Sequence, residues 1–371
     1  MSNNDLIKDT VNKAKEVGFE QVGFTNFYDF DFYSKKFNEF IKNKKYGEML
    51  WLNEKREIRA NPLKIWPEAR SAIVLGLNYA PQFNPMDGLK KKDKGYISVY
   101  ARRKDYHKVI KSKLKLLARD LSNKEGMKVK VFVDTAPIME KPLAELSGIG
   151  WFGKHSNIVS KKYGSWLFLG IILTDKEFPH NKKIERHCGK CNACIEICPT
   201  KAFDANYKLD ARKCISYLTI EHKTQIDLKY RDAIGNRIFG CDDCLSICPW
   251  NKFAKKHNEI RFNMIERLQL PPLKKLIRFD ENKYRSFFSG TPVRRLGYTR
   301  FLRNVLIAIG NSKELSLKES IIEKLDFKDE IVKSTAIWSL YKIDKNAFYE
   351  EKLKRYIYEK SELVKIEWER F

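Results

Sequence analysis

Residues 188–199 read CGKCNACIEICP, and residues 241–249 read CDDCLSICP. A solitary cysteine, Cys214, lies between these two segments. Together they account for all eight cysteines of the 371-residue chain, so no thiol is left over for another role. In the first segment three cysteines follow one another at every third position, and a fourth stands directly before a proline. This dense spacing predicts ligands for inorganic centres.

Four thiolates hold one [4Fe–4S] cube, so eight cysteines can hold two. The spacing C-x2-C-x2-C-x3-C-P is that of two-cluster ferredoxins, in which the fourth cysteine binds the other cluster. The second segment lacks its first cysteine, because Ile238 stands at that position, and Cys214 is expected to replace it. The predicted ligands are Cys188, Cys191, Cys194 and Cys248 for cluster one, and Cys198, Cys214, Cys241 and Cys244 for cluster two.

Zinc sites and disulfides are the other uses that grouped cysteines serve. Zinc sites favour C-x2-C pairs separated by a longer loop. Disulfides belong to oxidising compartments, and residues 1–10 are polar and lack the apolar segment of a secretory signal. No apolar run approaches the roughly 20 residues that a membrane span needs. We therefore expect two iron–sulfur clusters in a cytoplasmic protein that has no membrane partner.

The formal net charge of +25 is unevenly distributed along the chain. Residues 251–310 hold 14 Lys and Arg against 4 Asp and Glu, whereas residues 311–371 hold 13 of each. A basic excess confined to one segment predicts a polyanionic partner such as nucleic acid. The alternative is a lysine-rich composition that has no binding role.

The hydrophobic pattern divides the chain into three parts. In the first part helical patterns alternate with strand patterns, which predicts a mixed α and β domain. The last part is helical and resembles the short antiparallel helix pairs of an α-solenoid. Expected strands are 19–24, 69–78, 97–100, 128–134 and 166–173, and expected helices are 4–18, 32–43, 105–121, 138–147, 302–309, 315–325 and 331–343, with another opening at 46–51. The predicted domains are 1–177, 178–260 and 261–371.

Asp134 lies at the end of a predicted strand and beside a proline turn. Functional residues favour such loops, because a rigid sheet holds them in place. The neighbours Val133, Ala136 and Pro137 are apolar, which disfavours the charged carboxylate and predicts that Asp134 stays protonated as an acid. The alternative is an N-cap for a helix that starts at Pro137.

Two further motifs leave alternatives open. Residues 148–153 hold three glycines around Trp151, which is typical either of backbone close to a flat ligand or of an ordinary glycine-rich loop. The segment Asp105-Tyr106-His107 resembles the start of the corrinoid-binding pattern D-x-H-x-x-G, but Ile110 replaces the glycine. A histidine ligand to cobalt is therefore not predicted, and we expect His107 to serve a helix start or an anion contact.

Several of these motifs together resemble the epoxyqueuosine reductase family. They are residues 134–137 (DTAP), 140–141 (EK), 150–155 (GWFGKH), 188–199, 214–221 (CISYLTIE) and 240–251. The likeness extends over nearly the whole chain, including the basic segment at 295–311. It implies an α+β protein with a nitroreductase-like α/β cobalamin-binding domain, a ferredoxin-like two-cluster domain and a C-terminal α-helical HEAT-like repeat.

The resemblance also implies an activity. The chain would be an oxidoreductase that reduces epoxyqueuosine to queuosine at the wobble position of tRNA, the last step of queuosine biosynthesis. Its cofactors would be cobalamin, bound without a histidine ligand, and two [4Fe–4S] clusters. Cob(I)alamin would attack the epoxide, with Asp134 as the proton donor. The implied partners are a tRNA anticodon stem-loop and an external one-electron donor such as a ferredoxin or flavodoxin, and we expect a monomer.

Contact residues follow from the same resemblance. Ser98 is expected near the cobalt, and Arg59 near the corrin phosphate or the tRNA. Arg300 and Arg303 are three residues apart and share one helix face, although a solvated basic face is the alternative for them. The corrin candidates are Arg59, Ser98, Asp134, Lys154, His155, Asn157, Ser165, Ser216, His222 and Asp242, and the tRNA candidates are Lys274, Lys275, Arg294, Arg295, Arg300 and Arg303.

Two other functions stay open at this point. A soluble corrinoid-dependent reductive dehalogenase, or another iron–sulfur reductase, would keep the cofactors and change the substrate. The missing twin-arginine signal and the basic helical C-terminus argue against it. A ferredoxin-type electron carrier would need only a fraction of this chain length.

Overall fold

The computed structural model describes residues 3–371, whose segments gather into two compact units. The first unit comprises residues 3–83, Asp105–Arg212 and Asp243–Asn263, and the second comprises Asn84–Lys104, Lys213–Asp242 and Met264–Phe371. Both units mix helices with strands, which confirms the predicted mixed class. The division into three domains stays a prediction. The two units group segments that pack together, and each unit contains three separate stretches of the chain, so they do not test boundaries drawn along the sequence. No helix within residues 3–371 combines the length and the apolar character needed to span a membrane.

An antiparallel sheet of four strands, in the order β1-β2-β7-β4, forms the core of the first unit. The strands are β1 (Gln21–Thr25), β2 (Ser71–Asn78), β4 (Val129–Phe132) and β7 (Leu167–Thr174). Every residue of β2 is buried, as its continuous apolar run predicts for a central strand. The sheet therefore needs cover on both faces.

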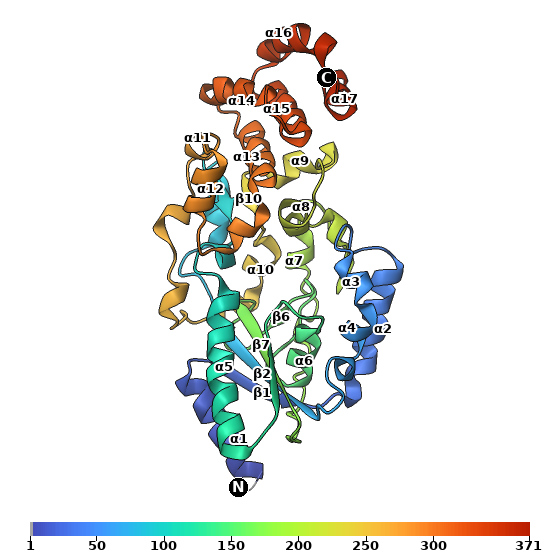
Figure 1. Cartoon of the computed structure of the whole chain (residues 1–371), viewed down its shortest axis with the longest axis vertical. Coiled ribbons are helices and arrows are strands. Elements are labelled where there is room, and N and C mark those ends of the chain that lie inside the picture. Colours follow the sequence, from blue (N-terminus) through green and yellow to red (C-terminus); the bar gives the residue numbers. More distant parts are fainter. Residues whose placement is uncertain (1–2) are drawn as a thin grey trace. The chain divides into compact units, whose positions relative to one another are not determined.

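Two helices supply that cover, α5 (Tyr106–Glu125) on one face and α6 (Glu140–Leu146) on the other (Figure 1). Gly170 of β7 lets α5 approach closely, since a Cβ atom there would lie 3.0 Å from Ile110 and 3.1 Å from Leu114. The other elements of this unit are α1 (Asn3–Glu16), α2 (Asp31–Lys42), α3 (Trp51–Glu54), α4 (Arg56–Ala60), β5 (Trp151–Phe152), β6 (Ile158–Val159), α7 (Ala193–Glu196), β8 (Phe203–Ala205), β9 (Lys208–Leu209) and α10 (Asp243–Ser246).

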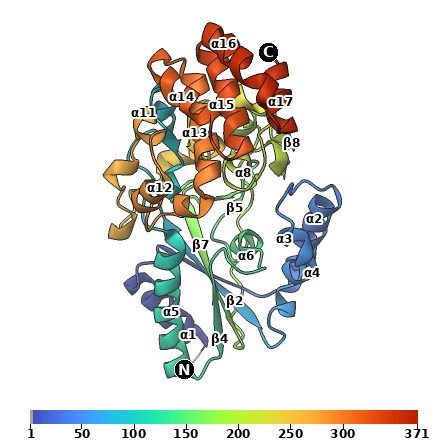
Figure 2. The ribbon, with the colours of Figure 1, turned by 45° about the horizontal axis from the view of Figure 1, so that its top comes forward.

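The second unit joins three separate stretches of sequence around one apolar core. Strand β3 (Tyr96–Ile97) pairs in parallel with β10 (Arg237–Phe239), and both contribute to the core of the C-terminal helices. Helices α13, α14 and α15 pack side by side (Figure 2). The helices of this unit are α8 (Ile215–Ile220), α9 (Leu228–Ile234), α11 (Leu273–Leu276), α12 (Glu281–Phe287), α13 (Tyr298–Ser312), α14 (Lys318–Leu325), α15 (Glu330–Ile343), α16 (Lys345–Arg355) and α17 (Glu362–Glu369).

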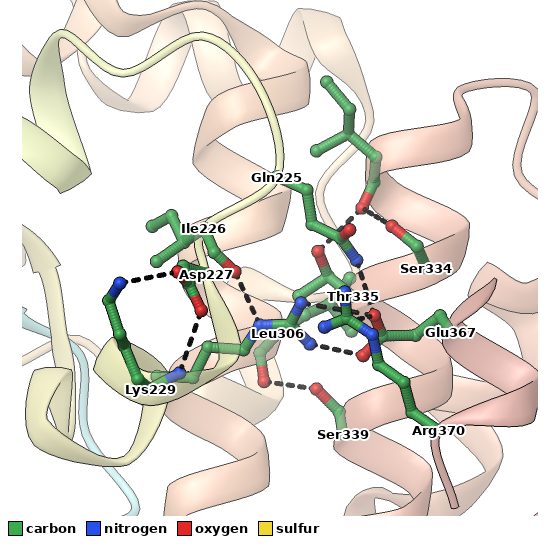
Figure 3. Close-up of polar contacts among 12 residues, drawn as sticks. Gln225, Ile226, Asp227, Lys229, Leu306, Ser334, Thr335, Ser339, Glu367 and Arg370 are labelled. Atoms are coloured by element: carbon green, nitrogen blue, oxygen red, sulfur yellow. Dashed lines mark hydrogen bonds and ion pairs between the residues drawn. The ribbon is translucent and has the colours of Figure 1, made fainter. Parts of the chain in front are cut away.

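A buried ion pair ties the last helix to this unit. The Arg231 side chain of α9 is 1% exposed and that of Glu367 in α17 is 0% exposed, and their Nη1 and Oε1 atoms lie 2.5 Å apart. Gln225 donates to Glu367 Oε2 over 3.0 Å, and Arg231 Nε donates to the Ile226 carbonyl over 2.8 Å. Figure 3 shows Gln225 and Arg370 converging on Glu367. The charge of Glu367 is thus fully compensated inside the protein.

Three local predictions are wrong. The strand expected at 97–100 ends at Ile97, because the carboxylate of Asp242 accepts the Val99 N–H and a 3-10 helix, Val99–Ala101, follows. The helix expected to open at 46–51 starts at Trp51, after turns that include Gly47 with φ of +61°. The glycine-rich segment 148–153, for which an ordinary loop was one alternative, contains β5, which pairs with β6.

Candidate functional site

Asp134 lies in the loop between β4 and α6, in the left-handed backbone conformation with φ of +48°. Its side chain is 59% exposed. The Tyr106 hydroxyl donates to Asp134 Oδ2, and His107 Nε2 lies 3.4 Å from the same oxygen. Both partners belong to the first turn of α5, so that helix presents two donors to the carboxylate at the end of a sheet strand.

A second carboxylate holds the other side of the imidazole. Asp105 caps the start of α5, and its Oδ1 lies 2.7 Å from His107 Nδ1. Burial lowers the pKa of His107, but its hydrogen bonds to Asp105 and Asp134 outweigh burial and raise the pKa above the ordinary value. The imidazole therefore favours its protonated form between two carboxylates.

The electrostatics of Asp134 differ from the prediction. Although the side chain is partly exposed, desolvation by the surrounding protein acts to raise the pKa of its carboxyl, but hydrogen bonds from His107 and Tyr106 lower the pKa below its ordinary value. The expectation that Asp134 stays protonated is therefore wrong for the carboxyl taken alone. The apolar neighbours in the sequence predicted a raised pKa, whereas the hydrogen-bond donors of α5 lower the pKa. The proton instead favours His107, one hydrogen bond away.

Glu140 and Arg59 complete the charges around Asp134. Glu140 Oε1 accepts the Asp134 N–H over 2.6 Å. Burial and the Asp134 charge raise the pKa of Glu140 to about 8. Burial lowers the pKa of Arg59, whereas the nearby charges of Asp134 and Glu140 act to raise it. The guanidinium lies over the ring of Trp51, 4.7 Å from its centroid, and its buried Nε has no hydrogen-bond partner among the described residues.

Three of the predicted corrin candidates form one continuous polar network in the first unit. Lys141 Nζ donates to Asn157 Oδ1 over 2.7 Å, and the Asn157 N–H donates to His155 Nδ1 over 3.1 Å. His155 Nε2 lies 3.2 Å from Ser165 Oγ. Burial and the charge of Lys141 lower the pKa of His155 to about 4, so this imidazole is neutral. The structure thus brings His155, Asn157 and Ser165 together.

Lys154 has a different role from the predicted one. It is buried, and its Nζ donates to Gly189 O, Cys191 O and Asn192 Oδ1, each over 2.9 Å. An ammonium group has three donors, so none is left for a corrin amide. The prediction of a corrin contact is corrected accordingly. Lys154 instead holds the loop that carries the first cysteines.

The four cysteines predicted for cluster one lie close to one another in the first unit. Burial, together with Cys188, Cys248 and Cys191, raises the pKa of the Cys194 thiol to about 11. Burial also raises the pKa of Cys248, which accepts a hydrogen bond from Ser165. Of the other four cysteines, Cys198 and Cys244 belong to the first unit, and Cys214 and Cys241 to the second.

Ser98 and Asp242 contact each other within the second unit. Asp242 Oδ1 accepts from Ser98 Oγ over 2.7 Å, and Asp242 Oδ2 accepts from Tyr96 OH over 2.6 Å. Burial and the Asp242 charge raise the pKa of Tyr96, and Arg102 lies over its ring, 4.6 Å from the centroid. These contacts fix the backbone around Ser98. The other two candidates of this unit, Ser216 and His222, are partly exposed.

The predicted tRNA arginines divide into two groups. Lys274, Lys275, Arg294 and Arg295 are exposed. Arg303 is fully buried, and its guanidinium donates to the carbonyls of Leu218, His222 and Thr224 over 2.8, 2.8 and 2.6 Å. A direct phosphate contact by Arg303 is therefore wrong. Arg300 shares its helix face, as predicted, and donates to the Ile220 carbonyl over 2.7 Å.

Sequence reasoning assigned no role to Tyr106 or to the carboxyl of Glu140. A signal existed for both, because Tyr106 stands beside His107 at a helix start and Glu140 lies six residues after Asp134. Neither spacing shows that the two side chains converge on one aspartate. That information resides in the packing of α5 and α6 on opposite faces of the sheet.

Comparisons with known proteins agree with this geometry. Residues 59–135 match the family model "Epoxyqueuosine reductase QueG, DUF1730", and residues 187–251 match the "4Fe-4S double cluster binding domain". The chain is 40% identical to the epoxyqueuosine reductase of Salmonella typhimurium over 83% of this chain and 81% of that protein.

Two solved structures resemble the whole chain. A crystal structure of epoxyqueuosine reductase with an epoxyqueuosine-modified tRNA-Tyr stem loop is 28% identical, with a TM-score of 0.91, and covers 100% of this chain and 98% of that one. A structure of epoxyqueuosine reductase from Bacillus subtilis, described with its Asp134 catalytic loop swung out of the active site, is 28% identical, with a TM-score of 0.88 and the same coverage.

Proposed function

Because the chain belongs to the epoxyqueuosine reductase family, we propose that it converts epoxyqueuosine to queuosine in tRNA with Asp134 and His107 as its proton-delivering pair. Membership of this family argues against the two alternative functions, a reductive dehalogenase and an electron carrier. Removing the epoxide oxygen as water consumes two electrons and two protons. The observation that carries the proposal is the chain of contacts from Asp105 through His107 to Asp134.

The pair divides the task of proton transfer. Of the two groups, His107 is the one to which we assign the exchangeable proton, because hydrogen bonds to two carboxylates raise the pKa of the imidazole while the pKa of Asp134 is lowered. Asp134 is the exposed member of the pair, so its carboxyl is accessible to a substrate oxygen. When negative charge develops on that oxygen, the proton on His107 Nε2 passes to Asp134 Oδ2 and from there to the substrate. Tyr106 orients the carboxylate by donating to the same oxygen. A catalytic loop described with Asp134 in the Bacillus subtilis relative supports this assignment.

The residues of this chain fit the cofactors that the family implies. Cys188, Cys191, Cys194 and Cys248 gather as four soft thiol donors, the set that a [4Fe–4S] cluster requires. For cluster two we propose Cys198, Cys214, Cys241 and Cys244. When bound, the clusters would relay single electrons, and cobalamin would supply a low-valent cobalt centre for reduction of the epoxide. Both ring nitrogens of His107 are engaged, which supports binding of cobalamin without a histidine ligand. Arg59, with its free Nε, is a candidate for the corrin phosphate.

The finer domain descriptions are also part of the proposal. The sheet covered by α5 and α6 supports a nitroreductase-like cobalamin-binding domain, and the double-cluster match at 187–251 supports a ferredoxin-like domain. The successive helices α13–α17 support a HEAT-like tRNA-binding repeat. We further propose that the substrate nucleoside is the wobble nucleoside of an anticodon stem-loop, that a ferredoxin or flavodoxin reduces the clusters, and that the protein acts as a cytoplasmic monomer.

A reconstitution tests the proposed function. The protein is purified without oxygen, its iron and sulfide are measured, and cobalamin is added. We expect about eight iron atoms per chain, as two cubes require, a cobalamin spectrum without an axial base, and loss of epoxyqueuosine from modified tRNA when a strong one-electron donor is supplied. Failure to take up cobalamin would contradict the proposal even with full iron content.

Affinity for tRNA is expected to depend steeply on salt. The exposed basic residues Lys274, Lys275, Arg294 and Arg295 would contact phosphates, and each such contact releases counterions. Fluorescence anisotropy with a labelled anticodon stem-loop, between about 50 and 200 mM salt, gives the slope of the logarithm of the binding constant against the logarithm of the salt concentration. Changing Arg294 and Arg295 to Gln should reduce the slope by about 2, one for each lost contact. The same double change at Lys8 and Lys15, on α1, serves as control, and equal slopes for both variants would remove this surface from the interface.

A further inference from the structure

The loop that carries Asp134 is closed by a contact with the next helix. Residues 133–139 join β4 to α6, and Glu140 is the first residue of that helix. Its Oε1 accepts the N–H of Asp134 itself over 2.6 Å. Asp134 has a left-handed backbone with φ of +48°, a conformation that costs energy for residues other than glycine. An external acceptor aimed at this very N–H stabilises the conformation that presents the carboxylate to Tyr106 and His107.

We propose that Glu140 is a positioning residue, which latches the Asp134 loop through a neutral carboxylic acid. The inference rests on the proposed function in one respect, the role of Asp134 as proton donor. The latch itself is a property of the loop and exists with or without turnover.

The charges around Glu140 explain why the latch must be neutral. The Asp134 carboxylate lies on the loop that Glu140 holds, so an ionised Glu140 would repel it. The cationic groups that face Glu140 are His107 from α5, Lys141 from its own helix and Arg59 from α4. Burial and the Asp134 charge prevail over these cations and raise the pKa of Glu140 to about 8. Below that value Glu140 remains neutral and still accepts the Asp134 N–H.

This arrangement gives the latch a defined pH dependence. In the closed loop the pKa of Glu140 is about 8, above the 4.5 of an ordinary glutamate. Opening the loop therefore releases a proton at neutral pH, and closure is favoured most at low pH. Closure weakens progressively as the pH rises from about 4.5 to about 8, and above that the pH no longer affects it. A glutamine at this position accepts the same N–H and cannot ionise, so it should remove the dependence.

Hydrogen exchange of the loop amides tests the proposal independently of activity. The full-length protein with its clusters is compared as wild type, Glu140→Gln and Glu140→Ala, with rates corrected for the intrinsic pH effect. In Glu140→Ala the peptide covering 133–139 should exchange about tenfold faster, the effect of one lost hydrogen bond. In the wild type protection should fall between about pH 4.5 and pH 8 and level off above that, and in Glu140→Gln it should stay flat. Glu68→Ala, an exposed carboxylate that pairs with Lys128, is the matched control and should resemble wild type.

Turnover provides the second readout. We expect Glu140→Ala to lower kcat with little change in KM, and Glu140→Gln to restore kcat. Unchanged loop exchange in Glu140→Ala, or an undiminished pH dependence in Glu140→Gln, would overturn the latch. If the alanine variant does not fold, the pH dependence of the glutamine variant still decides. The two proposals can fail separately. If exchange confirms the latch but Asp134→Asn stays active, the inference about Glu140 holds and the proposed proton role of Asp134 is refuted.

Discussion

Replacing Asp134 with asparagine is expected to lower kcat by about 10²–10⁴-fold, the range typical of a lost general acid. Asparagine keeps the size of the side chain and can still accept a hydrogen bond from Tyr106. It cannot take a proton from His107 and pass it on. Single-turnover assays with chemically pre-reduced protein and epoxyqueuosine-modified tRNA measure the effect on the proton-dependent step.

Two measurements keep this result specific. Iron content should equal that of wild type, because Asp134 is not among the predicted cluster ligands. Cobalamin content should also be unchanged, because asparagine keeps the size of the side chain and its contact with Tyr106. The same change at Asp29, another exposed aspartate of the first unit, should leave kcat unchanged. Near-normal turnover in Asp134→Asn would exclude it as the proton donor, whatever the state of the cofactors.

Replacing Glu367 with alanine is expected to destabilise the second unit by about 3–5 kcal/mol, as is typical when one partner of a buried ion pair is removed. The change leaves the Arg231 guanidinium, 1% exposed, without its carboxylate. It also removes the acceptor for Gln225, which connects α17 to the segment before α9. Chemical denaturation followed by circular dichroism measures the loss, and hydrogen exchange over 362–371 locates it.

The matched control lies on the same helix. Glu369 is exposed and accepts from the Tyr356 hydroxyl, so its change to alanine should cost less than about 1 kcal/mol, as exposed contacts do. Equal losses for Glu367→Ala and Glu369→Ala would show that the buried pair contributes no more than an exposed contact. A Glu367→Gln variant should fall between the two, because the amide oxygen still accepts from Arg231.

The regular elements of the fold were predictable where one pattern dominated. The apolar run at 69–78 and the helical spacing at 105–121 correspond to β2 and α5, because burial on both faces or on one stripe leaves a clear period. The prediction of a strand at 97–100 was wrong, because the Val99 N–H donates to the carboxylate of Asp242 and is therefore not available for pairing with another strand. A contact between residues so far apart in the chain does not change the local spacing of apolar residues, so the sequence pattern does not reveal it.

The site shows the same division between local and distant causes. The position of Asp134 at a strand end was predictable, and its ionisation was not. The pKa of its carboxyl depends on Tyr106 and His107, which another element delivers. Arg303 illustrates the limit of helical spacing: a shared face with Arg300 is predictable, whereas the direction of that face is not. Arg303 points inward because it donates to the carbonyl of Leu218 in α8 and to those of His222 and Thr224, which follow α8.

The interleaving of the second unit affects how the protein can be made. On the ribosome β3 and the segments with Cys214 and Cys241 emerge before α13. Their core partners are supplied by that later helix, where Asn304 Nδ2 donates to the carbonyls of Thr219 and Ile238 over 2.7 and 3.0 Å. Until α13 has been synthesised, the segments that carry these two cysteines therefore lack the apolar core against which they pack. For the cluster proposed at Cys214 and Cys241, we therefore expect assembly to follow synthesis of the C-terminal helices, because a premature stop before α13 would leave both cysteines without the core that positions them.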